Sequence, residues 1–77
     1  MVDHLTRVTV DARAARADEL ARALADRGFD VRRERSRIVA DSSEVEGQDV
    51  KAYLRGRGFE DREFQVFVEF VRKWGVL

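Results

Sequence analysis

The sequence matches itself when it is shifted by thirty residues. Residues 7–11, Arg-Val-Thr-Val-Asp, align with residues 37–41, Arg-Ile-Val-Ala-Asp. Residues 27–30, Arg-Gly-Phe-Asp, align with residues 57–60, Arg-Gly-Phe-Glu. The match predicts that both halves of the chain fold into the same small unit, which restricts the possible folds more than any other feature of the sequence.

Each half has the periodicity of a strand, a helix and a second strand. In the first half, Val8 and Val10 alternate with polar residues, which is typical of a strand with one buried face. The helix predicted over residues 12–27 has one apolar stripe, formed by Ala17, Leu20, Ala21 and Leu24. Gly28 is expected to end this helix in a left-handed conformation, with Phe29 folding back on the helix, and the aligned glycine ends the second helix in the same way.

The second half repeats this order with a different helix start and a longer final strand. Ile38 and Ala40 are the inward residues of its first strand. Ser43 and Glu46 have the spacing of a capping box, which predicts the start of the second helix. Residues 63–71 then alternate between the two faces of a strand that is long for so small a domain and extends past its neighbours.

Two successive strand-helix-strand units give the order β-α-β-β-α-β. The sequence therefore predicts an α+β fold of the ferredoxin-like class, a two-layer sandwich with a four-stranded antiparallel sheet and two helices on one face. We expect a single domain over residues 1–77 with an internal pseudo-repeat of thirty residues. In this arrangement the other face of the sheet is open.

The composition leaves little material for a catalytic or metal site. The sequence has no Cys and one His, and its 15 Lys and Arg residues balance 15 Asp and Glu residues. Disulfides, thiolate ligands and multi-histidine metal sites are therefore excluded, and the neutral charge gives no overall attraction to nucleic acid or anionic membranes. The serine hydroxyls fall in predicted turns and caps without an adjacent base, so we expect no enzyme activity and no cofactor.

Two segments resemble parts of known families. Residues 20–24, Leu-Ala-Arg-Ala-Leu, are similar to a helix of the amino-acid-sensing ACT domains, which share this order of elements. That resemblance implies a regulatory domain that senses a small ligand. Residues 46–59 resemble the last helix of the translation initiation factors that select the start site. The Asp-x-Pro-Gly-like ligand loop of the first family and the basic Gly-Gly loop of the second are absent from the sequence, so no residue role is transferred.

The open face of the predicted sheet carries several apolar residues. Leu5, Val39, Phe67 and Val71 are expected to form a patch there, with Trp74 in the C-terminal tail as a further anchor. An apolar patch beside an edge strand needs cover, and either the tail of the same chain or a second molecule supplies it. The patch predicts a noncatalytic interaction or regulatory module that forms a homodimer or binds another protein.

Four arginines gather in the hairpin between the second and third predicted strands: Arg32, Arg33, Arg35 and Arg37. This positive cluster has the chemistry to contact nucleic-acid phosphates or an acidic protein surface. The other interpretation is a solvated edge whose charges deter aggregation. A nucleic-acid or ribosome-associated factor is therefore an alternative function.

Membrane and export signals are not found in the sequence. No stretch reaches the roughly 20 apolar residues that a membrane-spanning helix needs, and the first residues lack the pattern of a signal peptide. A chain without cysteine also fits a reducing compartment. We expect a cytoplasmic protein without membrane contact, either a complete small protein or a single excised domain.

Overall fold

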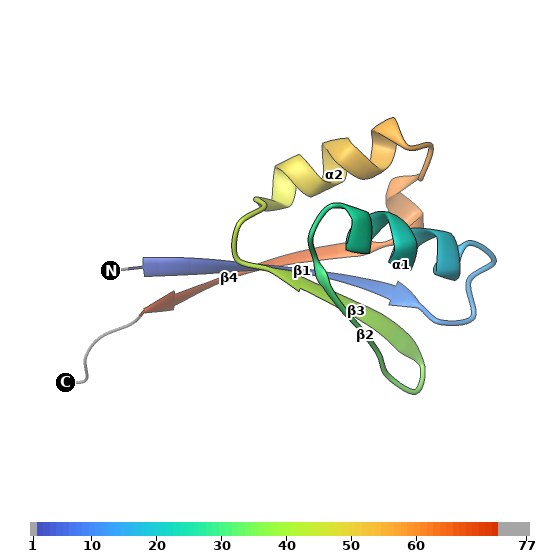
Figure 1. Ribbon diagram of the computed structural model, residues 1–77, viewed down its shortest axis with the longest axis horizontal. Helices are drawn as coiled ribbons and strands as arrows, with labels where there is room; N and C mark the ends of the chain where they lie inside the picture. The colour runs from blue at the N-terminus through green and yellow to red at the C-terminus, as the bar shows by residue number, and fades with distance from the viewer. Residues whose placement is uncertain (1, 73–77) are drawn as a thin grey trace.

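The computed structural model describes the backbone of residues 2–72 and the side chains of residues 4–69. Its elements are β1 (Val2–Asp11), α1 (Ala17–Asp26), β2 (Asp30–Arg33), β3 (Arg37–Ser42), α2 (Gly47–Gly56), the 3₁₀ helix η1 (Asp61–Glu63) and β4 (Gln65–Arg72). The four strands form one open antiparallel sheet in the order β2-β3-β1-β4. Figure 1 shows both helices on the same side of this sheet. The predicted α+β class with a four-stranded antiparallel sheet and two helices is therefore confirmed.

The core lies between the helices and the face of the sheet that they cover. The register places Val8 opposite Ala40 of β3 and Val66 of β4, and it places Val10 opposite Ile38. The helix residues that complete this buried cluster at 0% exposure are Leu20, Leu24, Val50 and Leu54. Burial of each large apolar side chain stabilises the fold by about 1.5–3 kcal/mol. The alternation in the strands and the stripes on the helices therefore serve the same core.

Both helices end in the same glycine turn. Gly28 and Gly58 have φ angles of 99° and 93°, in the left-handed region that glycine adopts without strain. In each turn the next N–H, of Phe29 or Phe59, donates to the carbonyl five residues earlier at 3.0 Å. This is the Schellman motif, and it confirms the predicted left-handed glycines. The motif directs each phenylalanine into the core, where both are 5% exposed.

The first helix is shorter than predicted. It begins at Ala17, five residues after the predicted start, because residues 12–16 form turns. The Asp11 carboxylate accepts the N–H of Arg13 at 2.8 Å, and the Asp11 carbonyl accepts the N–H of Ala14 at 3.0 Å. An aspartate that bonds the backbone two residues later favours a turn over a helix. β1 is therefore followed by a loop at the end of the sheet.

The capping box predicted at Ser43 and Glu46 does not form. The Ser42 hydroxyl instead accepts the N–H groups of Glu44 and Val45 at 3.1 and 3.2 Å, so a serine turn precedes α2. Glu46 is the N-cap residue by its backbone conformation, without a side-chain hydrogen bond. A capping box forms around η1, an element that the sequence analysis did not predict.

β1 and β4 extend beyond the rest of the sheet. β3 pairs with β1 from Thr6 to Asp11, whereas β4 pairs with β1 from Val2 to Thr9. Residues 2–5 and 69–72 therefore form a two-stranded ribbon, the β1/β4 overhang, which projects past both helices in Figure 1. The long last strand of the sequence predicts this extension.

Gly47 allows the start of α2 to approach β4 closely. A Cβ atom at this position would lie 2.7 Å from Val68 Cγ2 and 3.4 Å from Val66 Cγ1, and the first distance is shorter than van der Waals contact. We expect Gly47→Ala to destabilise the fold by about 1–3 kcal/mol through overpacking. The effect should appear although alanine is the better helix former by about 1 kcal/mol. Chemical denaturation of the purified variant measures the change in the free energy of unfolding.

Gly56→Ala is the matched control for this prediction. Gly56 lies at the other end of α2, where an added Cβ atom would meet nothing within 4 Å. Its substitution should stabilise the fold by up to about 1 kcal/mol. Val68→Ala in the Gly47→Ala background should restore most of the lost stability. Equal stabilisation by both glycine substitutions would contradict the close contact between α2 and β4.

Candidate functional site

Three residues of the predicted apolar patch, Leu5, Val39 and Phe67, share the open face of the sheet. The register places Val39 opposite Thr9 and Phe67 opposite Arg7, and Leu5 precedes Arg7 by two residues on the same strand. Leu5 is half-buried. The other two residues of the predicted patch, Val71 and Trp74, lie outside the described side chains.

A charged network crosses the middle of the open face. Arg7 donates from Nε to Asp41 Oδ1 at 2.8 Å and from Nη2 to Oδ2 at 3.3 Å. Arg32 Nη2 donates to Asp41 Oδ2 at 3.0 Å. The hydrogen bond to Asp41 is the main reason that the pKa of Arg7 is raised above its ordinary value. The network links β1, β3 and β2, and it separates Val39 from the apolar residues nearer the overhang.

Val39 is buried although no helix covers its face of the sheet. It is 2% exposed, and the register places it between Thr9 of β1 and Arg32 of β2. Arg32 reaches Asp41, two residues beyond Val39 on the same face, so its aliphatic stem passes alongside Val39. Val39 therefore packs within the monomer and offers little surface to a partner.

β4 exposes apolar side chains on both of its faces. Phe67 on the open face is 49% exposed, and Val68 on the helix-side face is 43% exposed. These neighbours lie where the β1/β4 overhang leaves the sheet, and the helix layer stops there because α2 begins at Gly47, directly against Val68. The sequence analysis named Phe67 in the apolar patch, and the alternation that it predicts over residues 63–71 puts Val68 on the opposite, covered face. The exposure of Val68 could not be predicted, because the sequence did not show that α2 begins directly against it.

Two hollows lie beside β4. One hollow of about 450 Å³ is lined by residues 64–67 together with Lys51 of α2 and Asp61 of η1. The hollow therefore lies between the start of β4 and these two elements. A second hollow of about 370 Å³ lies at the start of α2, and its lining is His4, Glu46, Gly47, Gln48 and Val68.

An ion pair between α2 and η1 holds the segment that leads into β4. Arg55 donates from Nε to Asp61 Oδ1 at 2.7 Å and from Nη2 to Oδ2 at 2.5 Å. The hydrogen bond from Arg55 lowers the pKa of the Asp61 carboxyl below its ordinary value of 3.8. The carboxylate is therefore ionised at neutral pH, and η1 is tied to the end of α2.

Two polar atoms near the overhang are buried without a hydrogen-bond partner in the described part of the chain. They are Thr6 Oγ1 and His4 Nε2. Thr6 lies opposite Val68 in the register, on the helix-side face of β1. A buried polar group without a hydrogen-bond partner destabilises the fold by about 1–3 kcal/mol. Hydrogen bonding of the buried side chains at this end of the sheet is therefore incomplete.

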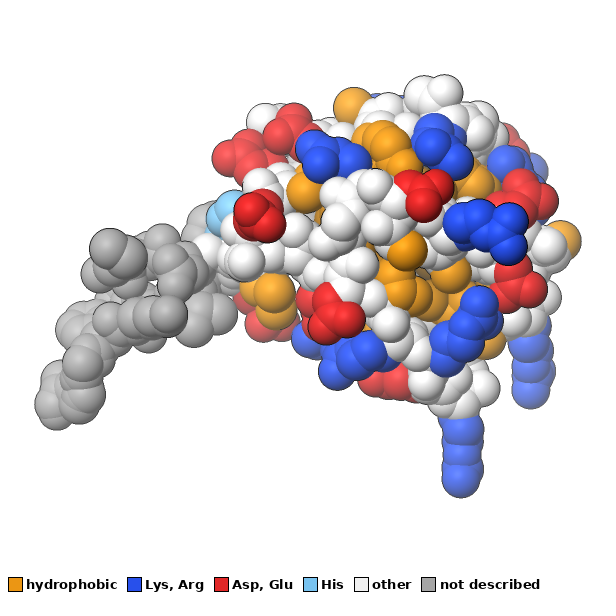
Figure 2. Space-filling model, viewed as in Figure 1, with side chains coloured by type: hydrophobic (Ala, Val, Ile, Leu, Met, Phe, Trp, Pro, Cys, Tyr) orange, Lys and Arg blue, Asp and Glu red, His pale blue; other side chains and the backbone are white. Residues whose placement is uncertain are grey.

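Three of the four arginines predicted to form a positive cluster bind carboxylates. The pairs are Arg32–Asp41, Arg33–Asp18 and Arg37–Glu34, with N–O distances of 3.0, 3.0 and 3.1 Å. Arg35 is exposed and makes no ion pair with the described residues. In Figure 2 positive and negative side chains are interspersed over the visible face. The positive charge of the hairpin is therefore largely balanced locally.

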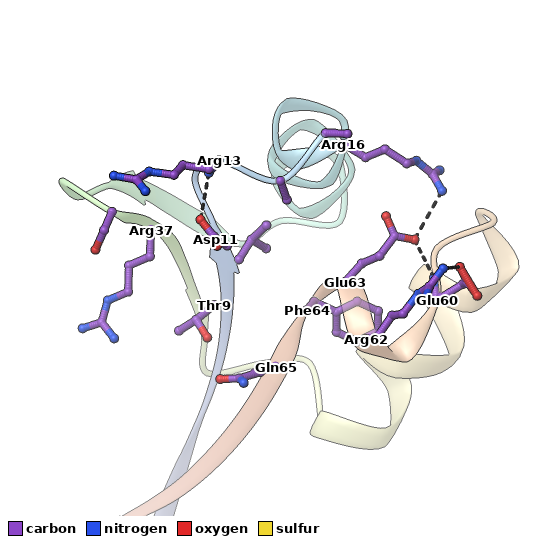
Figure 3. Close-up of a pocket in the computed structure, with 14 residues that line it drawn as sticks. Thr9, Asp11, Arg13, Arg16, Arg37, Glu60, Arg62, Glu63, Phe64 and Gln65 are labelled. Atoms are coloured by element: carbon purple, nitrogen blue, oxygen red, sulfur yellow. Dashed lines mark hydrogen bonds and ion pairs between the residues drawn. The ribbon is translucent and has the colours of Figure 1, made fainter.

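A hollow of about 930 Å³ lies at the end of the sheet away from the overhang. Its charged lining is Arg13, Arg16, Arg37, Arg62, Asp11, Glu60 and Glu63. Arg16 Nη1 lies 3.3 Å from Glu63 Oε1, and Arg62 Nη2 lies 2.9 Å from Glu60 Oε2. Figure 3 shows Arg13 and Arg37 on the opposite side of the hollow from Arg16 and Arg62, so the cations do not converge on one point. The sequence analysis missed this hollow because it assigned residues 12–16 to a helix.

Neither a metal-binding cluster within the described residues nor a related protein indicates the function of this chain. Over the described residues, no group of three His, Cys, Asp or Glu side chains is placed to hold a metal ion. Within residues 2–72, neither helix has the length and the apolar character needed to cross a bilayer. Comparison with protein-family models, curated proteins and solved structures finds no match for this chain. Its role must therefore be inferred from its own surface.

Asp41→Asn should weaken the network on the open face. The amide cannot balance the charge of Arg7 and Arg32, so we expect a loss of about 0.5–2 kcal/mol in the free energy of unfolding. Glu34→Gln is the control, because it removes an exposed pair with Arg37 and should change stability by less than about 0.5 kcal/mol. Urea denaturation compares the two variants. Equal effects would contradict a structural role for the network.

Proposed function

We propose that the chain is a small noncatalytic protein-interaction module that forms a homodimer through β4. The observation that carries this proposal is the exposure of Phe67 and Val68 on opposite faces of an edge strand. Unpaired backbone groups and exposed apolar side chains coincide on such a strand. A partner protein that adds its own strand to this edge forms hydrogen bonds with the unpaired backbone groups and buries the apolar side chains.

The difference between the two edges of the sheet supports this proposal. β2 has four residues, Asp-Val-Arg-Arg, of which three are charged. A short, charged edge discourages pairing with another chain. β4 has eight residues, of which two, Glu69 and Arg72, are charged. β4 therefore lacks the protection that β2 has.

The size and the charge of the chain also favour self-association. The core of a chain as short as 77 residues rarely supplies more than about 3–5 kcal/mol. Disulfides often supplement such a core, but the sequence has no cysteine. A net charge of zero removes the repulsion that keeps copies apart. Contact with a second copy would stabilise the folded state by mass action.

The ferredoxin-like class predicted from the sequence is part of this proposal. The succession of two strand-helix-strand units and the strand order β2-β3-β1-β4 support it. In that class one face of the sheet is free of helices. The open face and the β4 edge are then the surfaces available for a partner.

A nucleic-acid or ribosome-associated role is the second candidate, and the observation that favours it is the exposed Arg35 without an ion pair among the described residues. In this role, affinity for RNA or DNA falls steeply as salt rises. Arg33→Ala combined with Arg35→Ala should then flatten the salt dependence by roughly one unit of slope for each phosphate that the hairpin no longer neutralises. Titration of a labelled oligonucleotide at several salt concentrations measures it. An unchanged slope would exclude the hairpin as the binding surface.

Phe67→Glu should convert the proposed dimer into a monomer. A carboxylate placed in the interface would be desolvated without a counter-charge. Because Phe67 is about half exposed in the monomer, the fold should survive the change. We expect the dissociation constant to rise by more than about thirtyfold, as for an interface hot spot. Light scattering during size-exclusion chromatography over a dilution series gives the mass of each species.

Ala52→Glu is the matched control, because it adds the same charge at an exposed position of α2. It should leave the dimer intact. Circular dichroism at low concentration checks that both variants fold. A wild-type chain that stays monomeric at high concentration, or a dimer that tolerates Phe67→Glu, would refute the proposal.

A further inference from the structure

Symmetry limits the ways in which β4 pairs with a second copy of itself. Antiparallel pairing of two identical edge strands places a twofold axis perpendicular to the sheet. Directly opposed residues then lie on the same face of the joined sheet. Each permitted register therefore places one residue of β4 opposite its own copy, at the axis.

The sequence of β4 distinguishes among these registers. With Phe67 at the axis, Gln65 lies opposite Glu69 of the second copy, and this pair occurs twice. Val66 then lies opposite Val68 of the second copy on the helix-side face. Each carboxylate faces an amide that donates to it, each valine faces a valine, and the two phenylalanines meet across the strands.

The neighbouring registers match less well. An axis at Val68 or Phe70 places Glu69 opposite an apolar residue. An axis at Glu69 opposes two like carboxylates, and an axis at Val66 places Gln65 opposite the apolar Phe67. Like charges directly opposite each other destabilise a strand pair. Over the strand residues 65–69, the register centred on Phe67 is therefore the one among these in which each polar residue faces a suitable polar residue.

Within the described residues, β4 has no neighbouring strand on its outer side. A hollow of about 450 Å³ lies beside residues 64–67 and is also lined by Lys51 and Asp61. The Arg55–Asp61 pair holds η1 against the end of α2. The exposed side chains of Phe67 and Val68 would be covered on both faces of the strand by the same partner.

We infer that the partner is a second copy of this chain, joined by antiparallel pairing of β4 with β4 and with Phe67 at the twofold axis. This inference rests on the proposed function and adds the mode of pairing to it. The two four-stranded sheets become one continuous sheet. The helices of both copies lie on the same side of it.

Gln65→Lys and Gln65→Glu test the register at one exposed position. In the register centred on Phe67, each lysine faces Glu69 of the other copy, and the dimer should tighten by about three- to tenfold. Each glutamate faces the same carboxylate, so Gln65→Glu should weaken the dimer by a similar factor. A dilution series followed by light scattering measures both dissociation constants. Equal effects of the two variants would overturn this register.

Introduced cysteines give a direct second measurement, because the chain has no cysteine of its own. A mixture of Gln65→Cys and Glu69→Cys chains should form a mixed disulfide, since opposed residues have Cα atoms about 5 Å apart. Gln65→Cys alone should not cross-link, because its two copies would lie about 13 Å apart along the strands. Ala52→Cys is the control for random collision, since its position is exposed and lies on α2, outside the paired strand.

The outcomes separate this inference from the proposed function. A dimer in which the mixed disulfide fails to form and the two Gln65 variants behave alike would overturn the β4 register and leave the interaction module in place. A chain that is monomeric at all concentrations would overturn both. A mixed disulfide formed faster than the Ala52→Cys disulfide, with opposite effects of Gln65→Lys and Gln65→Glu, would establish the pairing.

Discussion

A strand is about twice as long as a helix of the same number of residues, and this difference shapes the molecule. The ten residues of β1 span about 33 Å, whereas the ten residues of α1 or of α2 span about 15 Å. The helices therefore cover about half of β1, and the remainder has β4 as its one neighbouring strand. The overhang, the exposure of Val68 and the hollow at the start of α2 all follow from this mismatch.

The face without helices is stabilised by other means. Long side chains from two strands converge on Asp41, and Arg32 lies opposite the buried Val39 in the register. This cover ends at β4, where Phe67 lies opposite Arg7, with Gln65 and Glu69 beside it on the same face. The exposed apolar side chains Phe67 and Val68 thus lie on β4, the edge strand that is also the less protected by charge. The same two facts explain why the proposed interface lies on β4 rather than over the whole open face.

Features set by a few adjacent residues were predictable from the sequence. The glycine-phenylalanine pairs define both helix ends, since no other residue adopts φ near 99° and 93° as readily as glycine. The alternation around Val8 and Val10 identified the buried face of β1. The start of α1 was wrong because a side-chain bond from Asp11 competes with the helix. The capping box was wrong because the neighbouring serine, Ser42, makes the turn instead.

The candidate site was only partly predictable, because exposure depends on residues that are distant in the sequence. Phe67 follows from the alternation of β4 alone. Val68 has the pattern of a covered residue, and its exposure depends on where α2 begins. Val39 has the pattern of a surface residue, and its burial depends on the reach of Arg32 across the sheet to Asp41.

The charged β2 strand has a consequence for any assembly joined at β4. In the joined sheet both outermost strands are copies of β2, each four residues long with three charges. Neither end then offers a template for a third chain, so growth terminates at a closed particle instead of continuing as a ribbon. The arginine-rich hairpin, which the sequence analysis considered as a binding site, would thereby limit the proposed assembly to two copies. The charged edge at β2 would then offset the tendency of the apolar edge at β4 to aggregate.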